Sequence, residues 1–156
     1  MTGTDGATVW LLVCGERMRE DDGVADVAAE QLPDDVRNLA HVEHIGVLSV
    51  EALLDVPPDC GIVVADLAAG LGTGVVGTVA LADVRRDGVY PATTHVTPPD
   101  EIIAAAAALT GLPIRGLFVG VGGAEFGFGD KLSPRVAAAL PDYVRALISA
   151  IRAQAR

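Results

Sequence analysis

The sequence has few aromatic residues, few cysteines and no long hydrophobic run. Only 4% of its 156 residues are aromatic although 51% are hydrophobic, so we expect a core of Val, Leu, Ile and Ala. No apolar run reaches the roughly 18 residues of a membrane-spanning helix, and Asp5 stands where a signal peptide would carry Lys or Arg. These absences predict a cytoplasmic protein with no membrane partner.

Positive charge is also scarce. Eleven Lys and Arg residues stand against 21 Asp and Glu, for a formal net charge of −10. Sites for nucleic acid need a basic patch, so we expect no nucleic-acid partner. Cys14 and Cys60 lie in or beside apolar stretches and lack the CxxC spacing of a zinc or redox site, so we interpret both as reduced core thiols.

Apolar runs alternate with helical patterns along the chain. Continuous apolar runs are typical of strands buried on both faces, and residues 41–45 alternate as a less buried strand. Ser49 can cap a short helix, Gly111 can end an Ala-rich one, and Ser133 can cap the last, which Pro141 should kink or split. We therefore predict strands at 8–14, 41–45, 61–65, 75–84 and 114–121, with helices at 24–32, 50–54, 99–110 and 134–151.

This order of elements predicts a single α/β domain spanning residues 1–156. Its expected architecture is a three-layer αβα sandwich around a twisted, mostly parallel sheet with one antiparallel segment. The turn signal Asp87-Gly88 could supply that segment by pairing residues 75–84 with Val89 and Tyr90 in a hairpin.

The stretch 72–77 matches the letters GxGxxG of a dinucleotide site. That fingerprint needs a strand directly before it and a helix opening at its end. Here the predicted strand ends several residues earlier, the β-branched residues that follow resist a helix, and no carboxylate near position 95 could hold a ribose. We interpret the stretch as a flexible or turn-forming glycine loop.

Asp22, Asp66 and His95 each follow a predicted strand, at 8–14, 61–65 and the shorter 88–92. The carboxyl ends of parallel strands form the crevice in which α/β proteins bind ligands. Two carboxylates and an imidazole would offer donor atoms to a divalent metal and leave coordination positions open. Their placement suggests metal-linked chemistry.

Each residue also has a simpler interpretation. Asp22, like Asp21 beside it, could cap a helix or interact with its dipole. Asp66 could form a turn, and His95 could be an ordinary loop histidine.

Together, the motifs resemble those of the hydrogenase maturation proteases, nearly end to end and in order. The stretch GERMREDDGV at 15–24 is similar to the family's opening Gly-Asn-x-Leu-x-x-Asp-Asp/Glu-Gly pattern. The later similarities are VAD at 64–66, TTH at 93–95, FVGV at 118–121 and KLSPRV at 131–136. The joint spacing carries the resemblance.

The resemblance implies an αβα fold and an endopeptidase that removes a C-terminal extension from the large-subunit precursor of nickel–iron hydrogenase. It places Asp22, Asp66 and His95 at the family's metal-contacting, catalytic positions. The nickel is carried by the substrate, no organic cofactor is implied, and we expect a monomer. Peptide hydrolysis would use metal polarisation of a carbonyl or activation of water, with a carboxylate as general base.

The chain departs from the family pattern at several positions, and two other functions remain open. The departures are Glu16 for the usual Asn, Ala25 for a common Gly, Gly122-Gly123 for a polar residue and Pro, and Asp130-Lys131 before the Leu-Ser-Pro turn. One alternative is a non-catalytic metal-binding or assembly protein of the same fold. The other is a metal-dependent hydrolase of small molecules. A Ser or Cys triad is not supported, because Ser133 is expected to be a helix cap and neither cysteine has an evident His partner.

Overall fold

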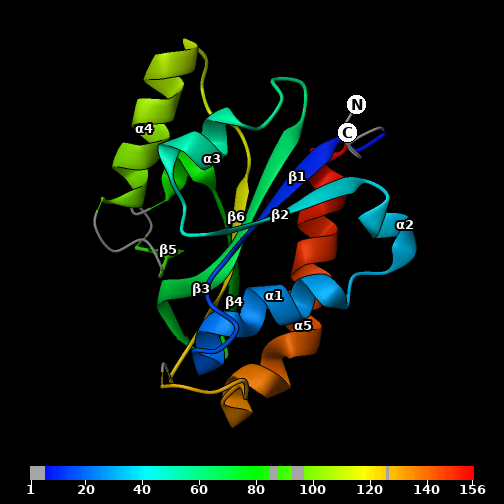
Figure 1. The fold of residues 1–156 in the computed structure, drawn as a ribbon, viewed down its shortest axis with the longest axis vertical. Helices are drawn as coiled ribbons and strands as arrows, with labels where there is room; N and C mark the ends of the chain where they lie inside the picture. The colour runs from blue at the N-terminus through cyan, green and yellow to red at the C-terminus, as the bar shows by residue number, and fades with distance from the viewer. Residues whose placement is uncertain (1–5, 85–87, 93–96, 126) are drawn as a thin grey trace.

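A mixed six-stranded sheet forms the centre of the computed structural model (Figure 1), which describes residues 6–84, 88–92, 97–125 and 127–156. Five strands lie in the order β2-β1-β3-β6-β4, and the short β5 pairs with β3. The strands are β1 (Val9–Cys14), β2 (Ala40–Gly46), β3 (Gly61–Thr73), β4 (Val76–Ala80), β5 (Tyr90–Pro91) and β6 (Leu117–Gly122).

Most of the pairings in the sheet are parallel. Strand β1 runs parallel to β2 and β3, and β3 runs parallel to β6. Strand β4 is antiparallel to β6, and β5 is antiparallel to β3. This arrangement confirms the predicted α/β class with its mostly parallel sheet.

Helices cover both faces of the sheet, which gives the three predicted layers (Figure 1). One face packs against α1, α2 and α5, and the other against α3 and α4. The helices are α1 (Val24–Glu30), α2 (Asp34–Arg37), α3 (Val50–Leu54), α4 (Pro99–Thr110) and α5 (Pro134–Gln154).

Local signals set several helix ends. The Ser49 hydroxyl accepts a hydrogen bond from the Ala52 amide at 3.1 Å, as expected of an N-cap. Helix α4 ends at Gly111 in the left-handed conformation. Pro141 lies inside α5, which runs unbroken from Pro134 to Gln154, so the proline does not split the helix.

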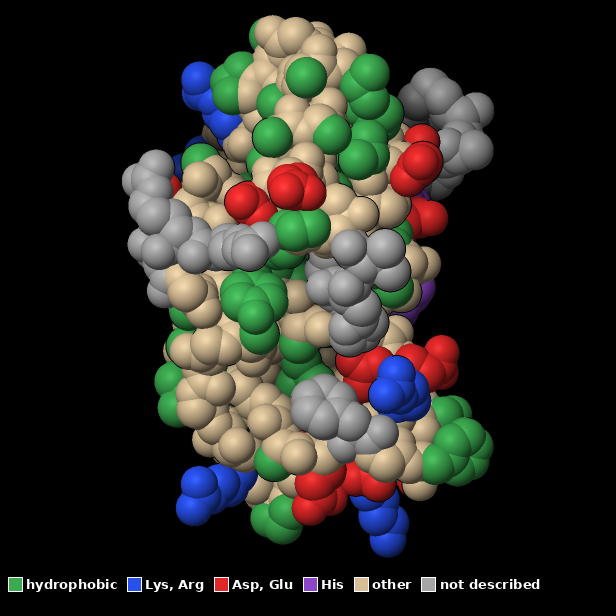
Figure 2. Space-filling view, turned by 90° about the vertical axis from the view of Figure 1, so that its left-hand side faces the viewer, with side chains coloured by type: hydrophobic (Ala, Val, Ile, Leu, Met, Phe, Trp, Pro, Cys, Tyr) green, Lys and Arg blue, Asp and Glu red, His purple; other side chains and the backbone are tan. Residues whose placement is uncertain are grey.

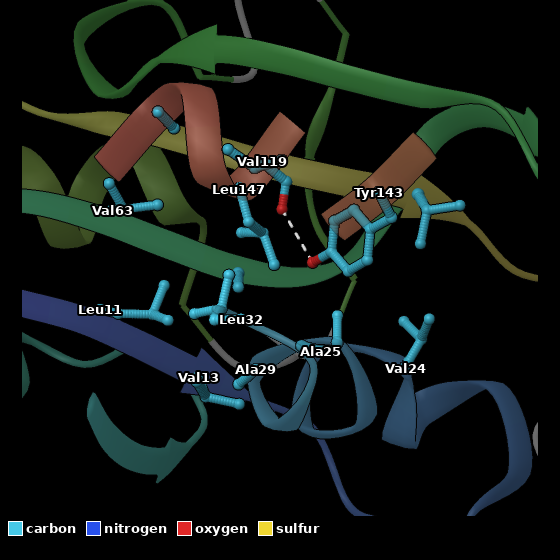
Figure 3. Packing of buried hydrophobic residues seen from close by; sticks show 14 of the residues in the cluster. Leu11, Val13, Val24, Ala25, Ala29, Leu32, Val63, Val119, Tyr143 and Leu147 are labelled. Carbon is cyan, nitrogen blue, oxygen red and sulfur yellow. Dashed lines mark hydrogen bonds between the residues drawn. The ribbon is translucent and has the colours of Figure 1, made fainter. Parts of the chain in front are cut away.

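Aliphatic side chains dominate the core on both faces of the sheet. Figure 3 shows the larger cluster, in which β1 and β3 pack against α1 and α5. Tyr143, fully buried in α5, donates hydrogen bonds to the carbonyls of Val119 at 3.1 Å and Asp66 at 3.2 Å. These contacts fasten α5 to β3 and β6.

Two features of the sheet differ from the sequence prediction. Strand β3 continues to Thr73, so most of the glycine-rich stretch that was predicted as a loop is strand, with a turn at Gly74. The next segment is the strand β4, as predicted. The proposed hairpin is wrong, because β4 pairs with β6 while Tyr90 pairs with Ala69 of β3.

The outer surface reflects the acidic composition. On the face shown in Figure 2, where α4 lies at the top, acidic side chains lie in several groups and Lys and Arg lie mainly toward the edges. None of the helices in the described part of the chain combines the length and apolar character needed to cross a bilayer.

Candidate functional site

The candidate site is built around the carboxyl end of β1, where the chain turns sharply. Gly15 follows the last residue of β1 and has a φ of +103°, a conformation that other residues rarely adopt. A Cβ atom at this position would lie 2.0 Å from the backbone oxygen of Asp22. Glycine therefore lets the turn that carries Asp22 pack directly against the end of β1.

Asp22 lies in a short 3-10 helix, η1 (Glu20–Gly23), that leads into α1. Its side chain is 5% exposed, and its Oδ2 atom accepts a hydrogen bond from the Glu16 amide at 2.9 Å. The next residue, Gly23, is also packed closely, since a Cβ there would lie 3.0 Å from the Cα of Arg17. These two contacts fold the loop 15–19 back over the turn.

The departure at Glu16 leaves the contact to Asp22 in place. The bond uses the backbone N–H of residue 16, which Asn and Glu share, while the Glu16 side chain is exposed. The negative charge that Glu16 adds is therefore on an exposed side chain, while the contact to the buried Asp22 carboxylate uses the backbone.

Asp66 is fully buried and lies inside β3, not after it. The sequence prediction that it follows a strand is wrong, because the pairing of β3 with β6 continues past Asp66 to Ala68. Its Oδ1 atom accepts a hydrogen bond from the amide of Leu67 at 2.7 Å.

The neighbour of β3 changes at Asp66. The pairing between β1 and β3 ends at Ala65, and on the same edge of β3 the next hydrogen bond comes from the Ala92 amide to the Leu67 carbonyl, at 2.9 Å. Strand β5 thus replaces β1 at this edge, with Asp66 between the two. The Asp22 backbone packs against Gly15 just past the end of β1, and Asp66 follows the last residue of β3 that pairs with β1, so both residues lie at the carboxyl end of β1.

His95 lies outside the described residues. The strand predicted just before His95 is present as β5, which has two residues. Because β5 runs antiparallel to β3, the prediction that His95 follows the carboxyl end of a parallel strand is wrong. The convergence of Asp22, Asp66 and His95 on one metal ion stays a prediction. Within the ranges that the structure describes, no three His, Cys, Asp or Glu side chains are grouped so that they could hold a metal.

Asp21 has a role that the sequence reasoning missed. It is fully buried, and its two oxygens accept four hydrogen bonds from residues more than 100 positions away: from the amides of Ala124 (2.8 Å), Glu125 (2.9 Å) and Ser133 (2.6 Å), and from the Ser133 hydroxyl (2.8 Å). Burial alone would raise the pKa of Asp21, but the hydrogen bonds from these donors outweigh it and lower the pKa below its usual value.

Ser133 uses both its amide and its hydroxyl to bind Asp21. It precedes α5 as an N-cap residue by its backbone, yet its hydroxyl makes no capping bond to the helix and donates to Asp21 instead. A carboxylate of lowered pKa is a weak base, and the Ser133 side chain is only 5% exposed. This pair is therefore poorly suited to nucleophilic catalysis, in agreement with the sequence argument against a Ser triad.

A second pair of loops meets beside η1. Residues 18–21 bond to residues 125–129 through three backbone hydrogen bonds, from the amides of Glu20, Asp21 and Gly129. Glu20, the one described non-glycine residue with positive φ, hydrogen-bonds to the carboxyl group of Glu125, which raises the pKa of Glu20. The loop after β6 is thus joined to the turn that carries Asp22.

No protein-family model matches the sequence, and no curated protein matches it. Solved structures do match. The NiFe hydrogenase maturation protease HybD from Thermococcus kodakarensis superposes with a TM-score of 0.69 at 18% identity, over 90% of this chain and 97% of that one.

Two further structures agree. The hydrogenase maturating endopeptidase HybD from E. coli gives a TM-score of 0.68 at 19% identity, over 93% of each chain. A hydrogenase 3 maturation protease gives 0.61 at 21% identity, over 90% of this chain and 89% of that one. The chain therefore has the fold of the hydrogenase maturation proteases, the family that its motifs resemble.

Proposed function

We propose that the protein is an endopeptidase that removes the C-terminal extension from a hydrogenase large-subunit precursor after nickel has been inserted. The observation that carries the proposal is that two buried aspartates, Asp22 and Asp66, lie at the carboxyl end of β1. They belong to two motifs that resemble those of the maturation proteases, in a chain that shares the fold of these enzymes.

In this proposal the metal belongs to the substrate. Asp22, Asp66 and His95 contact the nickel of the loaded precursor, and carboxylate oxygens with an imidazole nitrogen are suitable ligands for such an ion. The protease then acts only on a precursor whose nickel site is filled.

The chemistry follows from bringing nickel and carboxylates to the scissile peptide. The substrate's nickel polarises the carbonyl or activates a water molecule, and a carboxylate of the site takes the proton from the attacking water. The carbonyl carbon gains the water oxygen, the peptide nitrogen leaves with a proton, and a shortened precursor and a free C-terminal peptide result.

The test is to incubate the protein with nickel-loaded and nickel-free precursor and to measure product masses. The proposal expects two fragments from the loaded precursor and none from the nickel-free one. Equal amounts of fragments from the nickel-loaded and the nickel-free precursor would contradict the proposal that cleavage requires nickel.

Two matched variants sharpen this test. Asp22→Asn removes a carboxylate of the site at nearly constant volume. Asp35→Asn makes the same chemical change at an exposed position on α2, where the side chain bonds to Arg152 at 3.0 Å. The first variant should lose cleavage and the second should retain it.

The two alternative functions give different results in the same assay. A non-catalytic assembly protein would bind the loaded precursor and leave its mass unchanged. A hydrolase of small molecules would neither bind nor shorten it. Either result from folded wild-type protein would contradict the proposal.

A further inference from the structure

The clasp between Asp21 and the loop before α5 has no role in the proposed chemistry, although it lies next to Asp22. We define the clasp as the four hydrogen bonds that Asp21 accepts from Ala124, Glu125 and Ser133. It joins the turn after the first strand of the sequence to the segment between β6 and α5. We propose that Asp21 is a positioning residue that acts through the clasp to fix Asp22 at the end of β1.

The hydrogen-bonding capacity of the Asp21 carboxylate is filled by the clasp. Its Oδ1 accepts from one amide, and its Oδ2 accepts from two amides and a hydroxyl, all between 2.6 and 2.9 Å. Hydrogen bonds to a buried charged group are stronger than those between neutral groups. A carboxylate held by four donors in this way has little freedom to move, so the backbone of η1 is anchored at residue 21.

The position of Asp21 is transmitted to Asp22 through the backbone of η1. Asp22 is the next residue, its backbone oxygen packs against Gly15, and its Oδ2 is bonded to the Glu16 amide. This bond requires the loop 15–19 and η1 to keep their relative positions. A shift of η1 away from the clasp would lengthen the bond from Glu16 and turn the Asp22 carboxylate.

The clasp also explains the Leu-Ser-Pro motif at 132–134. Ser133 gives both its amide and its hydroxyl to Asp21, so a helix-cap residue is used to hold a distant turn. Pro134 begins α5 directly after it, and its fixed φ sets the direction in which the helix leaves the clasp.

Asp21→Asn is the variant that tests the inference. Asn keeps the volume of Asp but replaces one acceptor oxygen with an NH₂ group, which would face the N–H donors of the clasp. Ser133→Ala removes only the hydroxyl and leaves the other three bonds, so its effects should be smaller. Asp35→Asn serves again as the control for loss of one carboxylate.

One readout does not depend on any activity. The amide-proton NMR signal of Glu16 reports its bond to Asp22 in the folded molecules and does not depend on the folded fraction. In Asp21→Asn we expect this signal to move toward its position in Asp22→Ala, which lacks the acceptor, and in Asp35→Asn to stay in place. A Glu16 signal that stays at the wild-type position while the Ala124 and Glu125 signals move would overturn the inference.

The second readout rests on the proposed function, and is the rate of cleavage of nickel-loaded precursor under single-turnover conditions. Misplacing a group at a reacting centre by about 1 Å costs on the order of 100-fold in rate, so we expect Asp21→Asn to lose about 10–100-fold. A loss equal to the unfolded fraction, or a changed half-saturation at an unchanged rate, would contradict positioning.

The two failures can be told apart. If the wild-type protein leaves the loaded precursor intact, the proposed function fails while the Glu16 signal still decides whether Asp21 positions Asp22. If the wild type cleaves and Asp21→Asn cleaves equally fast, only the positioning role fails.

Discussion

Two adjacent carboxylates, Asp21 and Asp22, occupy different environments although both are buried. Asp21 accepts four hydrogen bonds from a distant segment, while Asp22 accepts a hydrogen bond from the Glu16 amide in its own loop. We assign the first to structure and the second to the proposed chemistry. This division of roles leads to two predictions at the scale of single residues.

The first concerns Asp22→Ala and His95→Ala, which we expect to abolish processing of the precursor while leaving the protein folded. The Ala variant of Asp22 leaves the Glu16 amide without its acceptor, which should cost about 1–3 kcal/mol. A domain of this size typically has about 5–15 kcal/mol of stability and should remain folded. A cleavage assay run beside thermal melts of both variants checks this. Processing by the His95 variant at the wild-type rate would show that the site is assigned incorrectly.

The second concerns the pH dependence of stability that Asp21 contributes. Because folding lowers its pKa, the folded state binds fewer protons at this group than the unfolded state, so its contribution is fully present above the unfolded pKa of about 3.9. It is lost as the pH falls through the lower folded pKa. We expect the Tm difference between wild type and Asp21→Asn to be large at neutral pH and to shrink below about pH 4. A difference that stays constant with pH would contradict this.

At the scale of elements, the turn from β1 into η1 depends on the absence of a side chain at Gly15. Gly46 offers a matched comparison, since it ends β2 with a φ of +71° but has no atom within 4 Å of the position of a Cβ. Gly46→Ala should cost only the backbone strain, about 1–2 kcal/mol. Gly15→Ala adds a collision with Asp22 and should cost about 2–5 kcal/mol. It should also lower cleavage, because Asp22 must move.

Denaturant unfolding and cleavage rates of the two glycine variants check this pair. Equal losses of stability would mean that the close approach of Asp22 to Gly15 contributes nothing. Wild-type cleavage by a folded Gly15→Ala protein would mean that the position of Asp22 is not set by this turn.

The sequence predicted the elements well where the signal was local. The apolar run of β1, the cap at Ser49 and the end of α4 at Gly111 follow from neighbouring residues alone. The length of β3 did not, because glycines are poor strand formers and this end of the strand depends on distant partners: Ala68 and Ala69 pair with β5, and Ala68 and Thr73 pair with β6. The two residues of β5 fall within the predicted strand 88–92, but their pairing with β3 is a contact that no local pattern reveals.

Local sequence signals identified some residues of the candidate site but not their distant hydrogen-bond partners. Asp22 and Asp66 were selected as residues that follow strands, and they do lie at one end of β1, although Asp66 is within β3. Asp21 was interpreted as a cap because its partners lie more than 100 residues away along the chain. Its hydrogen-bond partner Ser133 was predicted from the local sequence as a helix cap. The backbone of Ser133 is at the N-cap position, but the sequence did not reveal that the hydroxyl bonds to Asp21.

At the scale of the whole molecule, the proposal makes nickel a part of the substrate and not of the isolated protein. We therefore expect the purified protein, after treatment with a chelator, to hold well below one equivalent of any divalent metal. Elemental analysis measures this directly. A full equivalent of tightly held metal after chelation would instead indicate a resident metal cofactor.

The central claim is that Asp22, Asp66 and His95 contact the nickel of the loaded precursor. X-ray absorption at the nickel edge tests it most directly, on samples frozen after the protein and the precursor are mixed and before cleavage. Binding of wild-type protein should add oxygen or nitrogen ligands to the nickel, and binding of Asp22→Asn should add fewer. An identical nickel spectrum in the free precursor and in a demonstrated complex with wild-type protein would contradict the account.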